Sequence, residues 1–288
     1  MQIRKSARHA AKMRMAIQGP SGSGKTYSSI LLAKGLVKDL SRVVVIDTEN
    51  NSADLYSHLG DYNVMAFSRP FSPERFIQAI EESEIAGMEV IIIDSISHEW
   101  EGEGGILESH ANMPGNSFTN WSKLTPRHNA FVQRMLSSSA HVIATIRSKQ
   151  DYVISDKNGK MVPEKVGLKG VTRDSMDYEF TLVFDMQMNH QAKVSKDRTG
   201  LFNSKEPRNL NEEVGHRIAQ WCSEDNHEEK TDSFSESFAV RIEKAQSMEE
   251  LKKLYRMNPI DADRFKQFFT KRKYELQKHL QNGSIEHK

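Results

Sequence analysis

The sequence predicts an α/β fold in which helices flank a mostly parallel β-sheet. Between residues 13 and 221, short runs rich in Val and Ile alternate with helical stretches. Two of these runs, 42–47 (RVVVID) and 89–94 (EVIIID), are almost continuously apolar, which is typical of parallel strands buried on both faces. Strands that alternate with helices in this way form βαβ units.

The elements follow one another in a regular order along this core. We expect strands at residues 13–18, 42–47, 64–67, 89–94 and 141–146, and helices at residues 25–39, 53–59, 72–86 and 126–138. The third of these helices has a favourable start, because Pro73 lies at the first helical position, where an N–H group would have no partner within the helix.

A different pattern follows residue 147. Asn158 and Gly159 lie between β-rich flanks and predict a hairpin over residues 151–163. Residues 178–187 and 191–195 are expected to form two further strands, antiparallel to each other, at the C-terminal side of the core. Asn211 is a suitable N-cap for a helix that ends near residue 221.

Length and charge suggest the domain organisation. The 288 residues correspond to about two domains at the usual ~100–200 residues per domain. We expect a core at 1–222, an acidic linker at 223–237 with six acids and one Lys, and a small helical C-terminal module at 238–288, broken at Asn258-Pro259. The whole chain has 40 Lys and Arg against 39 Asp and Glu, which excludes a uniformly basic protein but leaves room for a local basic surface.

Cysteine content and hydropathy narrow the class further. The single cysteine, Cys222, excludes a disulfide framework and any cysteine-based metal site. No apolar run approaches the ~20 residues that a membrane-spanning helix needs. We therefore expect a cytoplasmic protein that does not enter a membrane.

A glycine-rich motif lies between the first predicted strand and the first predicted helix. It fits the pattern G-x-x-x-x-G-K-[ST] and consists of Gly19, Pro20, Ser21, Gly22, Ser23, Gly24, Lys25 and Thr26. Its glycines let backbone N–H groups face a phosphate at the N-terminus of a helix. Lys25 would reach the β- and γ-phosphates, and the Thr26 hydroxyl would coordinate Mg²⁺. The motif thus predicts a P-loop NTPase core with ATP and Mg²⁺ as cofactors.

Acidic residues at two strand ends complete this prediction. Asp94 follows four aliphatic residues and is suited to hold Mg²⁺ through water. Many related ATPases have a Glu directly after that Asp, but Ser95 lies there, so the general base that hydrolysis needs has to come from elsewhere. Glu49, at the end of the neighbouring strand, is the favoured candidate, and Glu99 is the alternative.

The segment that starts at the second predicted strand runs through residues 45–49 (VIDTE), Asp54-Leu55-Tyr56 and Leu59-Gly60. This segment resembles the RecA superfamily of ATP-driven recombinases. More narrowly, residues 13–202 resemble the phage-encoded, core-only RecA-like ATPases of single-strand annealing and recombination. The resemblance implies a RecA-like core in which Glu49 is the catalytic base and Tyr56 stacks on adenine. From the residues alone, Tyr56 could equally be a half-buried structural tyrosine.

Two later segments extend the resemblance. Residues 141–146, followed by Arg147-Ser148-Lys149-Gln150, are similar to the RecA strand that ends in a γ-phosphate sensor, and either Arg147 or Gln150 could fill that role. Ser195-Lys196-Asp197-Arg198 resembles the family's pair of cations that reach the neighbouring subunit's ATP. The resemblance therefore implies a homo-oligomer, ring or filament, with ATP at subunit interfaces. The alternative for Lys196 and Arg198 is a solvated charge cluster.

Residues 147–173 are the candidate DNA-binding region, because they contain seven cations and three acids. Single-stranded nucleic acid binds to cationic tracks that offer stacking surfaces. Residues 165–170 are expected to be flexible. A second candidate loop, 100–121, contains three glutamates and is a poor phosphate surface. The residues expected to touch DNA are Lys149, Tyr152, Lys157, Lys160, Lys165, Lys169 and Arg173. The alternative is a solvated basic hairpin.

These observations lead to one favoured function and two alternatives. The favoured function is an Mg-dependent, DNA-stimulated ATPase that oligomerises on single-stranded DNA and promotes annealing or strand pairing in the bacterial cytoplasm. Its C-terminal module is a candidate contact for a single-strand-binding protein. The first alternative is a monomeric or small-oligomer switch ATPase of the helicase-loader or defence type. The second is an ATP-stabilised scaffold with negligible turnover.

Overall fold

The computed structural model describes residues 11–157, 160–202, 206–223, 242–257 and 266–282, with no account of the side chains at 150–157, 160–167, 256–257 and 278–282. The chain divides into two compact units, residues 1–224 and 225–288. The expected acidic linker falls almost entirely outside the described residues, as does the expected break at Asn258-Pro259.

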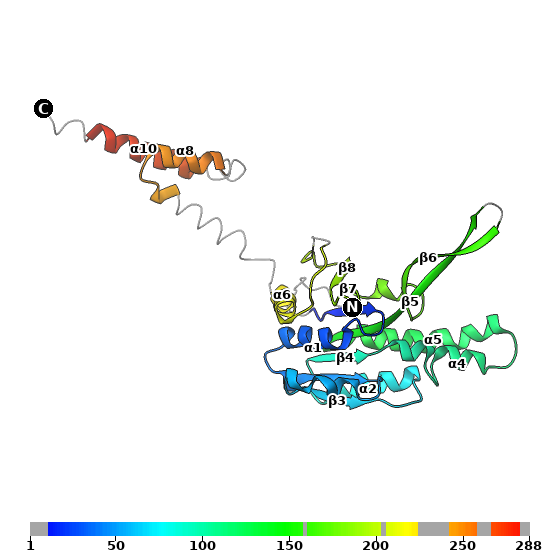
Figure 1. Ribbon diagram of the computed structural model, residues 1–288. Helices are drawn as coiled ribbons and strands as arrows, with labels where there is room; N and C mark the ends of the chain where they lie inside the picture. The colour runs from blue at the N-terminus through cyan, green and yellow to red at the C-terminus, as the bar shows by residue number, and fades with distance from the viewer. Residues whose placement is uncertain (1–10, 158–159, 203–205, 224–241, 258–265, 283–288) are drawn as a thin grey trace. The chain divides into compact units, whose positions relative to one another are not determined.

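The first unit is built on one β-sheet, with strand order β3-β2-β4-β5-β1-β7-β8 (Figure 1). All neighbours in this order are parallel except β7 and β8, and β6 pairs with β5 in antiparallel fashion. The strands are β1 (Arg14–Gly19), β2 (Val43–Asp47), β3 (Asn63–Ala66), β4 (Val90–Asp94), β5 (His141–Lys157), β6 (Lys160–Gly170), β7 (Leu182–Met186) and β8 (Ala192–Asp197). The predicted α/β class, with a mostly parallel sheet and antiparallel strands at its C-terminal side, is confirmed.

Helices cover both faces of this sheet (Figure 1). The α-helices of the first unit are α1 (Lys25–Leu36), α2 (Pro73–Ile85), α3 (Ser97–Glu101), α4 (Ile106–Ala111), α5 (Ser117–Leu136) and α6 (Glu212–Ser223), and the 3₁₀ segments are η2 (Leu40–Arg42), η3 (Ser52–Leu59) and η4 (Met176–Glu179). Val90 and Ile92 of β4 pack into a core with α1 and α6, whereas Ile91 and Ile93 pack into a core with α2 and α5. This alternation explains why the strands are apolar at nearly every position.

Helices α1 and α6 touch through two glycines. A methyl group added at Gly35 would lie 2.0 Å from the carbonyl oxygen of Glu212 and 2.7 Å from Cα of Gly215. The start of α6 is capped as expected, because the N–H of Val214 donates to Asn211 Oδ1 at 3.1 Å. The C-terminal end of the first unit is therefore packed closely on the helix that follows the glycine-rich loop.

Helix α5 is longer than the sequence predicts. It begins at Ser117 instead of Pro126, because Asn116 caps it by accepting a hydrogen bond from the N–H of Phe118 at 2.8 Å. Pro126 lies inside the helix, where it removes one backbone hydrogen bond but does not end the helix. The prediction of a loop at residues 100–121 is therefore wrong, since that stretch contains the end of α3, all of α4 and the first turn of α5.

Strand β5 also continues beyond its expected end at Ile146. It pairs with β6 from Ser148↔Gly170 to Lys157↔Lys160, so the two strands form an antiparallel arm that leaves the core, drawn in green in Figure 1. Residues 165–170, which were expected to be flexible, are instead part of β6, and all of them except Val166 have a register partner in β5. Residues 158–159, where the expected turn of the hairpin lies, are outside the described residues.

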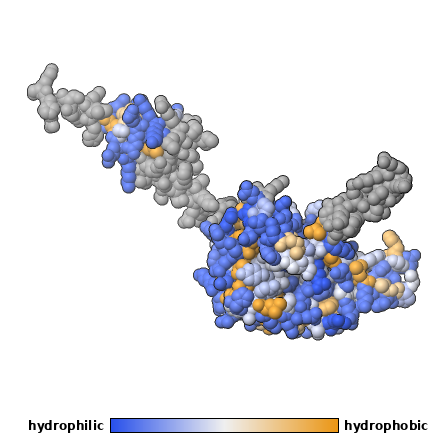
Figure 2. Space-filling view, in the orientation of Figure 1, coloured by the Kyte–Doolittle hydropathy of each residue, from blue (hydrophilic) through white to orange (hydrophobic). Residues whose placement is uncertain are grey.

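The second unit contains helices α8 (Met248–Met257) and α10 (Lys266–Asn282). A small core of its own unites Ile242, Ala245, Leu251, Leu254 and Phe269. The visible face of the described residues is mostly hydrophilic, with scattered apolar patches (Figure 2). No helix in the described part of the chain has the length and hydropathy to cross a membrane.

Candidate functional site

The glycine-rich loop connects β1 to α1 at the carboxyl edge of the sheet. Gly22 and Gly24 have φ angles of +79° and +88°, a conformation that a side chain would strain. These glycines turn the chain sharply, so that helix α1 begins at Lys25 directly after the loop. The backbone N–H groups of the loop and of the first helical turn are thus available to bind an anion.

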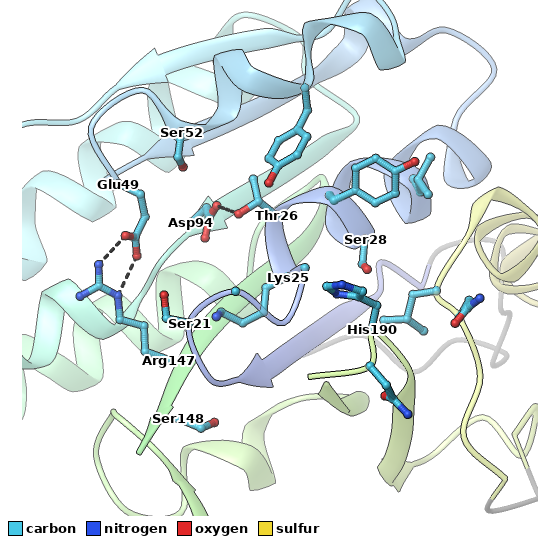
Figure 3. Close-up of a pocket in the computed structure, with 18 of the residues that line it drawn as sticks. Ser21, Lys25, Thr26, Ser28, Glu49, Ser52, Asp94, Arg147, Ser148 and His190 are labelled. Atoms are coloured by element: carbon cyan, nitrogen blue, oxygen red, sulfur yellow. Dashed lines mark hydrogen bonds and ion pairs between the residues drawn. The ribbon is translucent and has the colours of Figure 1, made fainter. Parts of the chain in front are cut away.

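A cavity of about 1250 Å³ lies beside this loop (Figure 3). Its volume exceeds that of the typical pocket for a small ligand, about 300–1,000 Å³, and is ample for a nucleotide. Its lining comes from the loop and α1, from the ends of β2, β4 and β5, and from three later segments. The lining residues are Ser21, Gly22, Gly24, Lys25, Thr26, Tyr27, Ser28, Leu31, Glu49, Ser52, Tyr56, Asp94, Glu101, Arg147, Ser148, Lys149, Val171, Asn189, His190, Asn209, Leu210 and Asn211.

Lys25 projects into this cavity from the first turn of α1 (Figure 3). Its Nζ atom donates to the carbonyl oxygens of Gly19 at 3.1 Å and Pro20 at 3.0 Å. Burial lowers the pKa of Lys25, and the negative charges of Asp94 and Glu49 only partly offset that effect. A phosphate group in the cavity would meet an ammonium group that has few solvent contacts.

Thr26 and Asp94 lie together at the base of the cavity. The Thr26 hydroxyl donates to Asp94 Oδ2 at 2.6 Å, and the Thr145 hydroxyl donates to the other carboxylate oxygen. Asp94 is 2% exposed, and burial raises its pKa although these two hydroxyl groups lower it. A bound cation would stabilise the charged carboxylate.

These two side chains fit a magnesium site. Mg²⁺ prefers oxygen ligands and is usually held by one or two carboxylates together with substrate phosphates. Within the described ranges, no cluster of three or more His, Cys, Asp or Glu side chains is placed to hold a metal. Thr26 and Asp94 are thus the residues that would hold Mg²⁺ beside a nucleotide.

Glu49 is positioned by a tight turn after β2. The carboxylate of Asp47 accepts hydrogen bonds from the N–H groups of Glu49 at 2.6 Å and Ala53 at 2.8 Å. Asn50 and Asn51 within this turn have φ angles of 55° and 64°, which Asn tolerates better than most residues. The turn directs the Glu49 side chain into the cavity, where it lies opposite the loop (Figure 3).

The Glu49 carboxylate forms a bidentate ion pair with Arg147. Arg147 Nε lies 2.8 Å from Oε1, Nη2 contacts Oε2, and the Ser95 hydroxyl donates to Oε1 at 3.2 Å. Burial raises the pKa of Glu49, but the hydrogen bonds and charge of Arg147 outweigh it and leave the pKa below its usual value. The sequence indicated Arg147 as a candidate phosphate contact, but it did not indicate the ion pair with Glu49, which is 98 residues away in the chain.

Glu99, the alternative base, lies elsewhere. Its side chain is 1% exposed, does not line the cavity, and is 3.0 Å from Nδ1 of the equally buried His128. Burial raises the pKa of Glu99 more than His128 lowers it. The geometry therefore favours Glu49 as the carboxylate that can activate a water molecule.

Tyr56 lines the cavity together with Tyr27, and their rings are 5.6 Å apart in an edge-to-face arrangement. Tyr56 is half-buried and also packs against the core around α1. Both interpretations of Tyr56, as a nucleotide contact and as a structural residue, are compatible with this position.

Among the remaining predicted site residues with described side chains, Lys149 lines this cavity, and the others do not. Lys196 and Arg198 belong to or follow β8, the last strand of the sheet, where Lys196 Nζ donates to the carbonyl oxygens of Asp177 at 3.1 Å and Tyr178. Lys149 and Lys169 are exposed at the foot of the arm, and Arg173 donates to Asn129 Oδ1 at 3.2 Å. No side-chain position is described for Gln150, Tyr152, Lys157, Lys160 and Lys165.

Several lining residues carry no recognisable signal in the sequence. His190 reaches the loop from the turn between β7 and β8, where its Nδ1 lies 3.1 Å from the carbonyl oxygen of Ser23. Ser52 lines the cavity, and its hydroxyl is buried without a hydrogen-bond partner among the residues described. Buried polar groups without a partner are few in folded proteins.

Comparison with known families agrees with this geometry. Residues 11–231 match the family model described as "AAA domain". A search of curated proteins found no match to this chain. The match covers most of the chain, which therefore belongs to this family of P-loop, nucleotide-hydrolysing ATPase domains.

Proposed function

We propose that this AAA-domain ATPase binds single-stranded DNA in an ATP-dependent manner, assembles on it, and promotes annealing or strand pairing. The observation that carries the proposal is the position of Arg147. It pairs with Glu49 in the nucleotide cavity and lies where β5 leaves the core to become the basic arm. Arg147 would thus couple ATP hydrolysis in the cavity to the position of the arm.

The ATP site follows from the residues that line the cavity. The loop N–H groups and Lys25 would hold the phosphates, and Tyr56 is suited to contact the base. Mg²⁺ at Thr26 and Asp94 would neutralise charge on the phosphates during transfer. Glu49 would orient and deprotonate the attacking water.

Arg147 restrains Glu49 in the observed arrangement. While both guanidinium N–H groups bind the carboxylate, Glu49 is a weaker base, because the lowered pKa reflects a stabilised charged form. A γ-phosphate offers the guanidinium an alternative bidentate partner of greater charge. Transfer of Arg147 from Glu49 to the phosphate would free the base and shift the root of the arm.

The arm supports DNA as the partner because of its register. Lys149 is opposite Lys169, and Lys157 is opposite Lys160, so cationic residues face each other across the two strands. Like charges directly opposite each other in a sheet are unfavourable. Asp174 lies 2.7 Å from Lys169 at the foot of the arm, and a phosphodiester backbone would supply further anions beside the two lysine pairs. Tyr152, which is opposite Lys165, offers a base-stacking residue.

Lys196 and Arg198 support assembly. Lys196 lies on the terminal strand of the sheet and Arg198 directly after it, and neither lines the cavity of its own chain. Cations in this position could reach the ATP of a neighbouring subunit in a ring or filament. This arrangement would place nucleotide at subunit interfaces.

A monomeric switch ATPase is the second candidate, and one observation favours it. Arg147 provides a cation beside the nucleotide cavity within the same chain, so hydrolysis would need no cation from a neighbour. In that case Lys196 and Arg198 would be solvated surface residues.

The deciding experiment measures ATP hydrolysis with and without oligothymidylate over a range of salt concentrations. Under the proposal, DNA stimulates turnover, and both stimulation and binding fall steeply with salt because phosphate contacts release counterions. Annealing of two labelled complementary strands should be faster with ATP, and Lys25→Ala should abolish this gain. A rate independent of DNA, without salt-sensitive binding, would select the switch ATPase instead.

A further inference from the structure

A second cavity of about 530 Å³ lies next to the nucleotide cavity, and ATP hydrolysis has no use for it. The two cavities share Glu101, Lys149 and Val171 in their walls. One side of the second cavity is aromatic and apolar and the other side is cationic. The residues that define these two sides are Trp100, Leu107, Trp121, Lys149, Lys169 and Arg173.

The aromatic side is a stack of three rings. The indoles of Trp100 and Trp121 are 5.9 Å apart with an angle of 21° between their planes, and Trp121 stacks on His110 at 4.3 Å with the same angle. Helices α3, α4 and α5 each supply one ring. The ring of His128 packs edge-to-face against Trp100 at 5.4 Å. His128 also contacts the buried Glu99. Trp121 is thus the middle ring of the stack, between Trp100 and His110, and Trp100 is the end ring that lines the cavity.

The cationic side is the foot of the arm. Lys149 of β5 is the register partner of Lys169 of β6, and both side chains are exposed. Lys169 Nζ lies 2.7 Å from Asp174, which also lines the cavity, and Arg173 binds Asn129. With Glu101, the lining holds three cations and two acids, a balance suited to one or two phosphates and not to a long polyanion track.

We infer that this cavity binds one or two nucleotides of single-stranded DNA, with a base against Trp100, the end ring of the stack, and the adjoining phosphate on Lys149 and Lys169. Flat aromatic surfaces beside cations are how proteins hold single strands without sequence preference. The inference rests on the proposed function and names the site at which the strand enters the core. Because Lys149 lines both cavities, DNA at this site and ATP in the first cavity are neighbours.

The test uses the three tryptophans of the chain, which are Trp100, Trp121 and Trp221. Trp221 belongs to α6 and packs against the core around α1, so it serves as the internal control. The Trp221→Phe variant emits only from the cavity, and the Trp100→Phe/Trp121→Phe variant emits only from the control position. We expect oligothymidylate to quench the first variant and to leave the emission of the second unchanged.

Affinity provides the second measurement. In fluorescence anisotropy with a labelled oligothymidylate and ATP, Trp100→Ala should weaken binding by about 5- to 100-fold, because one base loses its stacking partner. Trp100→Phe should restore most of this affinity. Circular dichroism melting of each variant shows whether the fold is kept.

Four results would overturn the inference. Oligothymidylate that binds without quenching the Trp221→Phe variant, and equally well after Trp100→Ala, would leave the proposed function intact but place the strand elsewhere. Equal quenching by a duplex would exclude stacking, since paired bases are not exposed. A change in oligomeric mass after Trp100→Ala, at unchanged DNA affinity, would make a second copy of the chain the occupant. Absence of DNA binding in every variant would refute the proposed function as well.

Discussion

Replacing Glu49 by Gln separates a catalytic from a structural role at the nucleotide site. The substitution keeps the shape of the side chain and removes its charge. In the structure this charge is bound by Arg147, with the two side chains 25% and 38% exposed, and by the Ser95 hydroxyl. A partly exposed ion pair of this kind contributes about 1 kcal/mol or less to the free energy of unfolding.

The expected effect on hydrolysis is much larger. Loss of a positioned general base slows a reaction about 10²- to 10⁴-fold, which corresponds to about 3–5 kcal/mol in the activation barrier. Glu49→Gln should therefore bind a fluorescent ATP analogue, unfold at nearly the wild-type temperature, and hydrolyse ATP at least about 100-fold more slowly in single-turnover measurements.

Two other carboxylates serve as controls. Glu101→Gln changes an exposed residue of the same cavity wall and should leave the hydrolysis rate within a few-fold of wild type. Glu99→Gln disturbs the buried contact with His128 and should lower the free energy of unfolding by about 1–3 kcal/mol while the folded protein still hydrolyses ATP. If Glu49→Gln hydrolyses ATP normally and either control loses activity, the assignment of the base is refuted.

Three further predictions concern assembly, pH and packing. A protein with Lys196→Ala and Arg198→Ala should regain ATP hydrolysis when mixed with Glu49→Gln subunits, if these cations act on a neighbour; inactivity of the mixture would argue for a site within one chain. Burial and nearby Lys12 and Arg14 lower the pKa of His141 to about 4, and its Nδ1 accepts a hydrogen bond from the Met13 N–H at 3.1 Å, so the folded protein holds the neutral ring. Its contribution to the free energy of unfolding should be complete above pH ~6.5 and decline by up to about 3 kcal/mol as the pH falls toward 4; urea unfolding of wild type and His141→Gln across this range measures the difference, and parallel curves would contradict it. Gly35→Ala should destabilise the protein by about 3 kcal/mol, because its methyl group would collide with the backbone of α6, whereas Lys34→Ala on the exposed side should cost less than about 1 kcal/mol in the same denaturation assay.

Local chemistry made much of the core predictable. The glycine-rich loop could be recognised because eight contiguous residues determine its backbone, with Gly22 and Gly24 in conformations that other residues resist. Asp94 could be placed because it ends a strand that is apolar on both faces. The predictions were wrong where packing or strand pairing outweighed a local preference. Pro126 was expected to begin a helix but lies inside α5, and residues 165–170 were expected to be flexible but belong to β6, which pairs with β5.

The sequence by itself thus determined the P-loop α/β core, its phosphate-binding loop and the acidic residue beside it. Only the tertiary structure decided that Arg147 binds Glu49, that Trp100 stacks on Trp121, and that Lys149 lies opposite Lys169. The physical reason is the separation in sequence of the residues that interact. Backbone conformation and strand burial depend on neighbours in the chain, whereas these pairs join residues that are far apart in sequence and meet only because strand order and helix packing bring them together.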